Sequence, residues 1–265
     1  MRIIKSTRII LPIVLGISGF IMILISEIIY QIQGSKILII AWLASILITI
    51  STFIIRFYSI DPENFKEVIQ KTNTVENRQL NPNRFLNWIL IAMIVGLVAT
   101  IVIAYNFIIG MIIYLLMQIS LIIAFSGIVF INPSVQLSHP KLRKVFLISI
   151  IFWIMFIPVV FFILVWNGTE SLIVVPYVIT IGSMACISWF GLGYNQRSKL
   201  FRYFIVIASS LFVFSDLLIG NARYGMIKLD IYLLIDITYV LNIFLMSHAQ
   251  LFLQGVLKLD SGKQK

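Results

Sequence analysis

Runs of mainly apolar residues, each about 20 residues long, recur eight times along this chain. A helix that crosses a membrane needs this length, because the hydrocarbon core is about 30 Å thick and each helical residue rises about 1.5 Å. We therefore predict an all-α fold: a polytopic membrane protein with a bundle of eight transmembrane helices, residues 1–265 forming one membrane domain. The predicted spans are approximately Ile9–Ile29, Ile37–Ile55, Phe85–Tyr105, Phe107–Ile131, Val145–Trp166, Leu172–Phe190, Tyr203–Ile219 and Ile231–Leu253.

The composition agrees with this prediction and excludes several classes of protein. Apolar residues make up 60% of the chain and charged residues 11%, whereas a soluble domain usually carries about 25% charged residues. Too few polar side chains remain to cover a water-soluble fold of this length. The chain is therefore not a soluble enzyme, a disordered tail or a secreted disulfide scaffold, and its single cysteine, Cys186, cannot form an intramolecular disulfide.

The distribution of basic residues predicts the orientation of the spans. The formal net charge is +10, which we attribute to the enrichment of Lys and Arg in cytoplasmic loops and not to nucleic-acid binding. With eight spans, 17 basic residues fall on the side of the two termini and 3 on the opposite side. We therefore expect a multi-pass protein of the cell membrane with both termini in the cytoplasm. The 3 basic residues on the opposite side are Lys36, Arg223 and Lys228.

The longest loop, residues 57–84, allows two interpretations. Asp61-Pro62-Glu63 is a good helix start, and Phe65, Val68 and Ile69 would then share one helical face. This pattern favours a short amphipathic helix at the membrane interface. A solvated linker of mixed charge fits the same residues equally well.

Three carboxylates lie within predicted spans, and a charge at this depth is costly enough to make each a functional candidate. They are Glu27, Asp216 and Asp236. Glu27 lies close to a span end, where its side chain can reach the interface. Asp216 is about four residues from the outer end of its span and Asp236 about one and a half turns into the next. Together with Tyr177 at similar depth, they predict a polar layer in the outer half of the membrane.

Polar and small residues also recur at helical spacing on four spans. Such stripes are typical of helix–helix packing, and they would equally suit the lining of a common cavity. No phosphate loop, dinucleotide fingerprint, CxxC or HExxH motif is present, and no Lys lies deep in a span to form a retinal Schiff base. We therefore expect no cofactor and no metal. The stripes are Gly110/Tyr114/Met117/Gln118, Tyr177/Ile181/Met184/Ser188, Ser209/Val213/Asp216/Gly220 and Tyr232/Asp236/Tyr239/Ile243.

The last two spans carry the clearest sequence motifs. Ala208–Leu218 reads ASSLFVFSDLL, and Thr238–Asn242 reads TYVLN. These segments resemble the "LF-x-x-SD-x-x-L" and "TYY-x-AQ" patterns of the YhhN family of eight-helix lysoplasmalogenases. Two earlier spans resemble further patterns of the family, so the resemblance covers roughly residues 86–250. The earlier segments are Phe107–Gly110 followed by Tyr114 and Gln118, and Pro176-Tyr177 followed by Met184.

The resemblance implies a membrane-embedded lipid hydrolase that cleaves the vinyl-ether or ether bond of a lysolipid. In such a reaction a carboxylic acid protonates the alkene carbon and water adds to the resulting cation. Asp216 is the expected acid, because an apolar setting keeps a carboxyl neutral. The expected substrate-binding residues are Ser215, Tyr239, Tyr177, Gln118, Tyr114 and Asn242.

One departure from the family pattern leaves the activity open. The family carries a Gly-Asp pair in its third span, whereas residues Gly96–Thr100 contain no carboxylate. Our own inference is that Asp236 replaces the missing partner, as the second of two carboxylates does in glycoside hydrolysis. The alternative is a non-catalytic lipid-binding or sensory membrane protein of the same fold. A proton-coupled transporter that uses Asp216 and Asp236 as relay groups is a third hypothesis.

Overall fold

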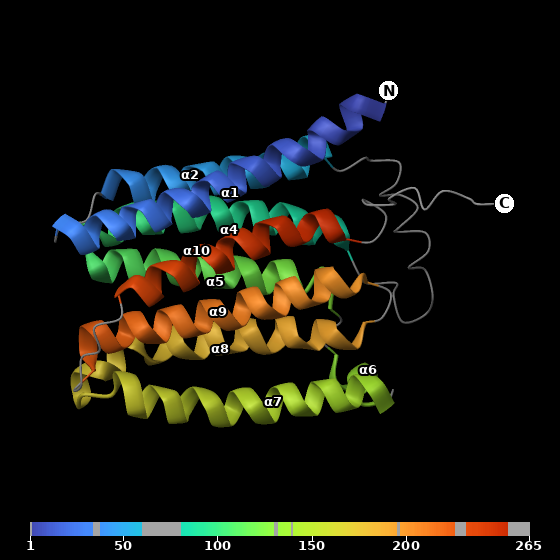
Figure 1. Ribbon diagram of the computed structural model, residues 1–265. Coiled ribbons are helices and arrows are strands. Elements are labelled where there is room, and N and C mark those ends of the chain that lie inside the picture. Colours follow the sequence, from blue (N-terminus) through green and yellow to red (C-terminus); the bar gives the residue numbers. More distant parts are fainter. Residues whose placement is uncertain are drawn as a thin grey trace.

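The computed structural model describes residues 2–33, 38–59, 81–129, 132–138, 140–194, 197–225 and 232–253. Within these ranges the chain is helical and contains no strand, and eight helices are long and apolar enough to cross a membrane. Figure 1 shows them side by side with their axes roughly aligned. The predicted fold class and the number of spans are therefore confirmed. The long helices are α1 (Arg2–Gln33), α2 (Leu38–Ile54), α4 (Pro82–Ile103), α5 (Phe107–Phe125), α7 (Pro140–Val160), α8 (Val175–Phe190), α9 (Lys199–Tyr224) and α10 (Tyr232–Ala249).

Short helical segments extend or connect these helices. A π-helical turn continues α2, and another continues α7 after Pro158, the proline inside that helix. Single 3-10 turns precede α8 and follow α8 and α10. The short segments are η1 (Ile55–Ser59), α6 (Pro133–Ser138), η2 (Phe161–Val165), η3 (Thr169–Val174), η4 (Gly191–Gly193) and η5 (Gln250–Phe252).

Local capping explains where several helices begin. The side chain of Asn81 accepts a hydrogen bond from the Arg84 N–H, and Pro82 occupies the first helical position of α4. Asn106 caps α5 through the Ile109 N–H, and Ser198 caps α9 through the Phe201 N–H. Each cap satisfies a donor that the helix leaves unpaired. The short break predicted at Tyr105-Asn106 thus separates two helices: α4 ends before it, and the Asn106 cap begins α5.

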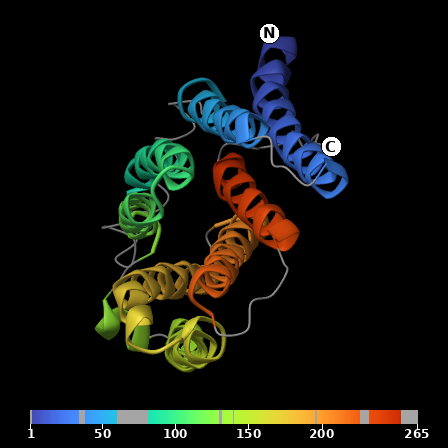
Figure 2. The same cartoon turned by 90° about the vertical axis from the view of Figure 1, so that its left-hand side faces the viewer.

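The helices enclose a centre formed largely by α9 and α10. Seen end-on in Figure 2, α10 lies among α1, α2, α4 and α9, and α9 also contacts α8. Helices α1 and α10 respectively begin and end at the same end of the bundle (Figure 1). We call this the basic end, because all described Lys and Arg residues except Arg223 lie on the segments that meet there. The opposite end is called the far end.

The outward faces of the helices are strongly apolar. On α7 and its π-helical extension, Ile154 is 67% exposed, Met155 65% and Ile163 73%. Water would not tolerate such a continuous apolar surface, whereas lipid chains cover it without penalty. The chain is therefore a multi-pass membrane protein.

One boundary differs from the sequence-based prediction in a way that affects function. The seventh span was expected to end at Ile219, but α9 continues to Tyr224. Asp216 therefore lies eight residues, or about 12 Å, from the end of its helix, twice as deep as predicted. The expected interfacial helix and the side chain of Glu27 lie outside the described residues.

Candidate functional site

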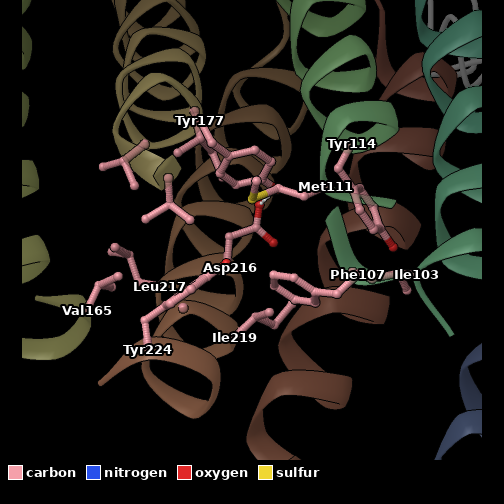
Figure 3. A pocket seen from close by; sticks show the side chains of 14 residues that line it. Ile103, Phe107, Met111, Tyr114, Val165, Tyr177, Asp216, Leu217, Ile219 and Tyr224 are labelled. Carbon is pink, nitrogen blue, oxygen red and sulfur yellow. Dashed lines mark hydrogen bonds between the residues drawn. The ribbon is translucent and has the colours of Figure 1, made fainter. Parts of the chain in front are cut away.

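A pocket opens between the helices at the far end (Figure 3). It is bounded by the end of α4, the start of α5, η2, η3, the start of α8 and the end of α9. Asp216 is the only carboxylate or cation among its lining residues, and most of the others are aliphatic or aromatic. The lining residues are Ile103, Phe107, Met111, Tyr114, Val165, Val174, Tyr177, Val178, Ile181, Asp216, Leu217, Ile219, Gly220 and Tyr224.

Two side chains donate hydrogen bonds to the carboxyl group of Asp216. The Tyr177 hydroxyl lies 2.5 Å from Oδ2, and the Gln118 amide nitrogen lies 3.4 Å from the same oxygen. Oδ1 receives no hydrogen bond from the described residues, so it can carry a proton. Figure 3 shows the carboxyl of Asp216 at the centre of the pocket, with the Tyr177 ring beside it. Three helices, α5, α8 and α9, therefore position this single acid.

A second polar group joins α4, α5 and α10 next to the pocket. The Thr100 hydroxyl donates to the Gly96 carbonyl at 2.9 Å. It therefore accepts from the hydroxyls of Tyr114 and Tyr239, at 2.8 and 3.0 Å. The two tyrosine rings meet edge to face with their centroids 5.9 Å apart. Sequence reasoning did not identify Thr100 as part of this group; its only signal was a hydroxyl within an apolar span.

Two amide side chains, those of Gln118 and Asn242, lie one helical turn from the two tyrosines, toward the basic end. Both are fully buried, and their polar atoms are only partly paired. Gln118 follows Tyr114 by four residues on α5, and Asn242 follows Tyr239 by three on α10. Gln118 Oε1 and both side-chain polar atoms of Asn242 have no hydrogen-bond partner among the described residues. Buried polar groups in proteins are almost always paired, often through water. Of these atoms, Gln118 Oε1 belongs to a side chain that contacts Asp216, and it marks a place where water can be held next to this carboxyl.

Two predicted site residues lie elsewhere. Ser215 is fully buried, and its hydroxyl donates to the Ile235 carbonyl at 3.2 Å, which ties α9 to α10. Asp236 neither lines the pocket nor contacts Asp216. The Ser215–Ile235 hydrogen bond places Asp236 at nearly the same level of the bundle as Asp216, so the two carboxyls differ in the helical face that carries them and not in depth. The residue of α10 that contacts the pocket wall is Tyr239, three residues after Asp236, whose ring meets that of Tyr114.

Among the predicted site residues, Asp216, Tyr177 and Gln118 are brought into direct contact, and Tyr114 forms part of the pocket wall. Tyr239 and Asn242 lie behind that wall. No group of three His, Cys, Asp or Glu side chains that could hold a metal ion occurs among the described residues. His248 contacts the carbonyls of Phe244 and Pro12 and the hydroxyl of Ser51, toward the basic end.

Comparison with known proteins identifies the family. No curated protein and no solved structure matches the chain. A sequence model of the YhhN family matches residues 73–251, which include every helix that contributes to the pocket. The match covers more than half of the 265 residues. The chain therefore belongs to the YhhN family.

Proposed function

We propose that this protein is a membrane-embedded hydrolase of the lysoplasmalogenase type, which cleaves the vinyl-ether bond of a single-chain lipid. The observation that carries the proposal is the carboxyl group of Asp216 in an apolar pocket, with both of its hydrogen-bond donors on Oδ2. Membership of the YhhN family and a lipid-facing fold support it further.

The chemistry requires a neutral acid, and the surroundings of Asp216 favour one. No Lys or Arg lines the pocket, and an apolar environment disfavours a carboxylate that has no charged partner. With Tyr177 and Gln118 donating to Oδ2, Oδ1 is the oxygen left to carry the proton of the neutral acid. In the proposed reaction Oδ1–H protonates the alkene carbon distant from the ether oxygen, which places the positive charge on the adjacent, oxygen-bearing carbon.

The remaining steps return the acid to its starting state. As Asp216 becomes a carboxylate, the donors Tyr177 and Gln118 stabilise its charge. Water adds to the cationic carbon and transfers a proton to Asp216, giving a hemiacetal. The hemiacetal then collapses to an aldehyde and a glycerol hydroxyl, so that one water is consumed for each bond broken.

The attacking water can be held by the buried amides. The unpaired Oε1 of Gln118 lies on the side chain whose amide nitrogen bonds Asp216. A water that donates to this oxygen would stand beside both the acid and the bound substrate. Asp236 has no part in this mechanism, in which one carboxyl serves first as acid and then as base.

The same pocket is also compatible with the second hypothesis, a non-catalytic lipid-binding or sensory membrane protein. A single carboxyl without a charged partner is also what a non-catalytic lipid-binding relative would retain. The two hypotheses differ in turnover: only the hydrolase releases aldehyde from a lysoplasmalogen.

The decisive experiment is an aldehyde-release assay on purified protein and on Asp216→Asn. We expect aldehyde from the wild type and a loss of at least about a hundredfold in the variant. Asn resembles the neutral acid in shape, so Asp216→Asn should insert into the membrane and unfold at the same temperature as the wild type near neutral pH. Unchanged activity in the variant would refute the role of Asp216, and absence of activity in the wild type would favour the lipid-binding alternative.

We further propose that the protein resides in the cell membrane with its termini, and thus its basic end, in the cytoplasm. Support comes from the segregation of Lys and Arg. In this orientation the pocket opens toward the outer leaflet.

A further inference from the structure

We propose that Arg223 and Phe107 form a phosphate-binding rim at the mouth of the pocket, which selects lysolipids with a phosphate in the head group. The inference rests on the proposed function, because it assigns the orientation of the lipid relative to Asp216. It adds a specificity-determining residue that the reaction chemistry alone does not identify.

The position of Arg223 is the first argument. Its guanidinium carbon lies 5.2 Å from the centroid of the Phe107 ring, and Phe107 lines the pocket. The Phe107 ring also meets the ring of Tyr224, another lining residue, with centroids 6.1 Å apart. Stacking on an aromatic face favours a cation electrostatically and restricts its position. The guanidinium is thus held at the rim, and its exposed side remains open to a ligand.

The charge of Arg223 is the second argument. It is the only described Lys or Arg at the far end of the bundle. In the part of the chain that the structure describes, its guanidinium contacts the Phe107 ring and forms no ion pair. A planar guanidinium with free donors suits a phosphate group, which it can bind through two parallel hydrogen bonds.

The spacing along α9 is the third argument. Arg223 follows Asp216 by seven residues, so both lie on one helical face about 10.5 Å apart along the axis. In a glycerol-based lysolipid, six bonds separate the carbon that water attacks from the phosphorus, a reach of roughly 7 Å with bonds of about 1.5 Å. Asp216 and Arg223 can therefore contact the vinyl ether and the phosphate of one molecule at the same time. The hydrocarbon chain is left to the apolar lining.

The test measures binding without turnover. The probes are a saturated hexadecyl ether lysophosphocholine, which contains no vinyl-ether bond, and the matching hexadecyl glycerol ether, which lacks the phosphate. Both are titrated against the wild type, Arg223→Gln and Lys199→Gln in detergent micelles. Lys199→Gln is the matched control, because it removes one exposed charge from the opposite end of the same helix.

We expect Arg223→Gln to weaken binding of the phosphate probe about tenfold, the usual effect of losing a hydrogen bond to a charged group. Binding of the neutral probe should be unchanged, and Lys199→Gln should match the wild type with both probes. Equal losses for both probes, or no loss for either, would overturn the inference. Displacement of the phosphate probe by millimolar inorganic phosphate would also overturn it, since the site would then belong to free phosphate.

The binding experiment and the aldehyde assay test different hypotheses, so failure of the phosphate-binding rim can be told apart from failure of the proposed hydrolase. A protein that discriminates the probes as expected but releases no aldehyde would refute the hydrolase and leave the rim in place. A protein that releases aldehyde but does not discriminate the probes would refute the rim alone.

Discussion

In the proposed reaction, the hydroxyl of Tyr177 stabilises the charge that develops on Asp216. It donates the shorter of the two hydrogen bonds to Asp216 Oδ2, and this bond strengthens when the carboxyl loses its proton. Removing it should slow the proton-transfer step more than it weakens substrate binding.

We therefore predict that Tyr177→Phe lowers kcat by about 10- to 100-fold, with a smaller change in KM. The control is Tyr194→Phe, which removes another buried tyrosine hydroxyl, bonded to Gln136 at the basic end. Tyr194→Phe can lower stability, but the activity per folded molecule should equal that of the wild type. A kcat for Tyr177→Phe within twofold of the wild type would contradict the assigned role.

Arg197 differs from Asp216, because its buried guanidinium has too few hydrogen-bond partners. It is 3% exposed, and both terminal nitrogens of its guanidinium lack a hydrogen-bond partner in the described structure. Burial lowers the pKa of Arg197 to about 10 from 12.5. Because the folded state binds this proton more weakly than the unfolded state, the charged form opposes folding below pH 10, and this effect declines as the pH rises above 10.

Arg197→Met should therefore raise the unfolding temperature near neutral pH, by about 2 °C or more. The difference in unfolding temperature between Arg197→Met and the wild type should stay constant from neutral pH to about pH 9 and become smaller above pH 10. Thermal unfolding in detergent measures both effects, with Arg143→Met, an exposed arginine at the same end, as the control. A less stable Arg197→Met would mean that an anionic partner holds this guanidinium.

At the scale of elements, the α4–α5 hairpin sets the shape of one pocket wall. A Cβ added at Gly110 would lie 2.5 Å from both Cα and Cβ of Ile103. Glycine thus allows the two helices to meet closely just after the Asn106 cap. Met111 and Tyr114, on the next turn of α5, line the pocket from this position.

Gly110→Ala should destabilise the protein by about 1–3 kcal/mol, because a backbone atom must move to admit the methyl group. The displaced wall should also lower the activity of the folded fraction. Gly191→Ala is the control, since its Cβ would find its nearest neighbour, in Val129, at an ordinary 3.7 Å. In thermal unfolding, Gly110→Ala should therefore unfold at a lower temperature than Gly191→Ala. Equal unfolding temperatures would contradict the close packing of α4 on α5.

At the scale of the whole molecule, the orientation in the membrane can be tested apart from the chemistry. On a Cys186→Ala background, single cysteines are introduced at Asn167 and Lys199, which are both exposed and lie at opposite ends of the bundle. We expect an impermeant thiol reagent to label position 167 in intact cells and position 199 only after the membrane is opened. The reverse pattern would invert the proposed topology.

The spans and their boundaries were largely accessible from the sequence because their causes are local. A run of apolar residues must be long enough to cross the hydrocarbon core and must pair its own backbone groups, so length and composition decide each span. Asn81 and Asn106 cap helices through residues three positions away. The end of α9 was missed because Asn221 and Arg223 interrupt the apolar run. Asn221 is nevertheless buried, and its side-chain amide donates to the Leu164 carbonyl on η2.

The sequence by itself therefore determined the eight spans, the segregation of basic residues and the candidate acid Asp216. Only the tertiary structure decided which polar groups meet that acid. Asp216 and Asp236 are equivalent candidates along the chain, but contact depends on the rotation of each helix against its neighbours, which no single helix encodes. Ser215 and Ile235 meet at one level of the bundle, but only Asp216 faces Tyr177 of α8 and Gln118 of α5, and Asp236 does not line the pocket. Packing between helices thus selected one carboxyl and two donors from a larger set of candidates.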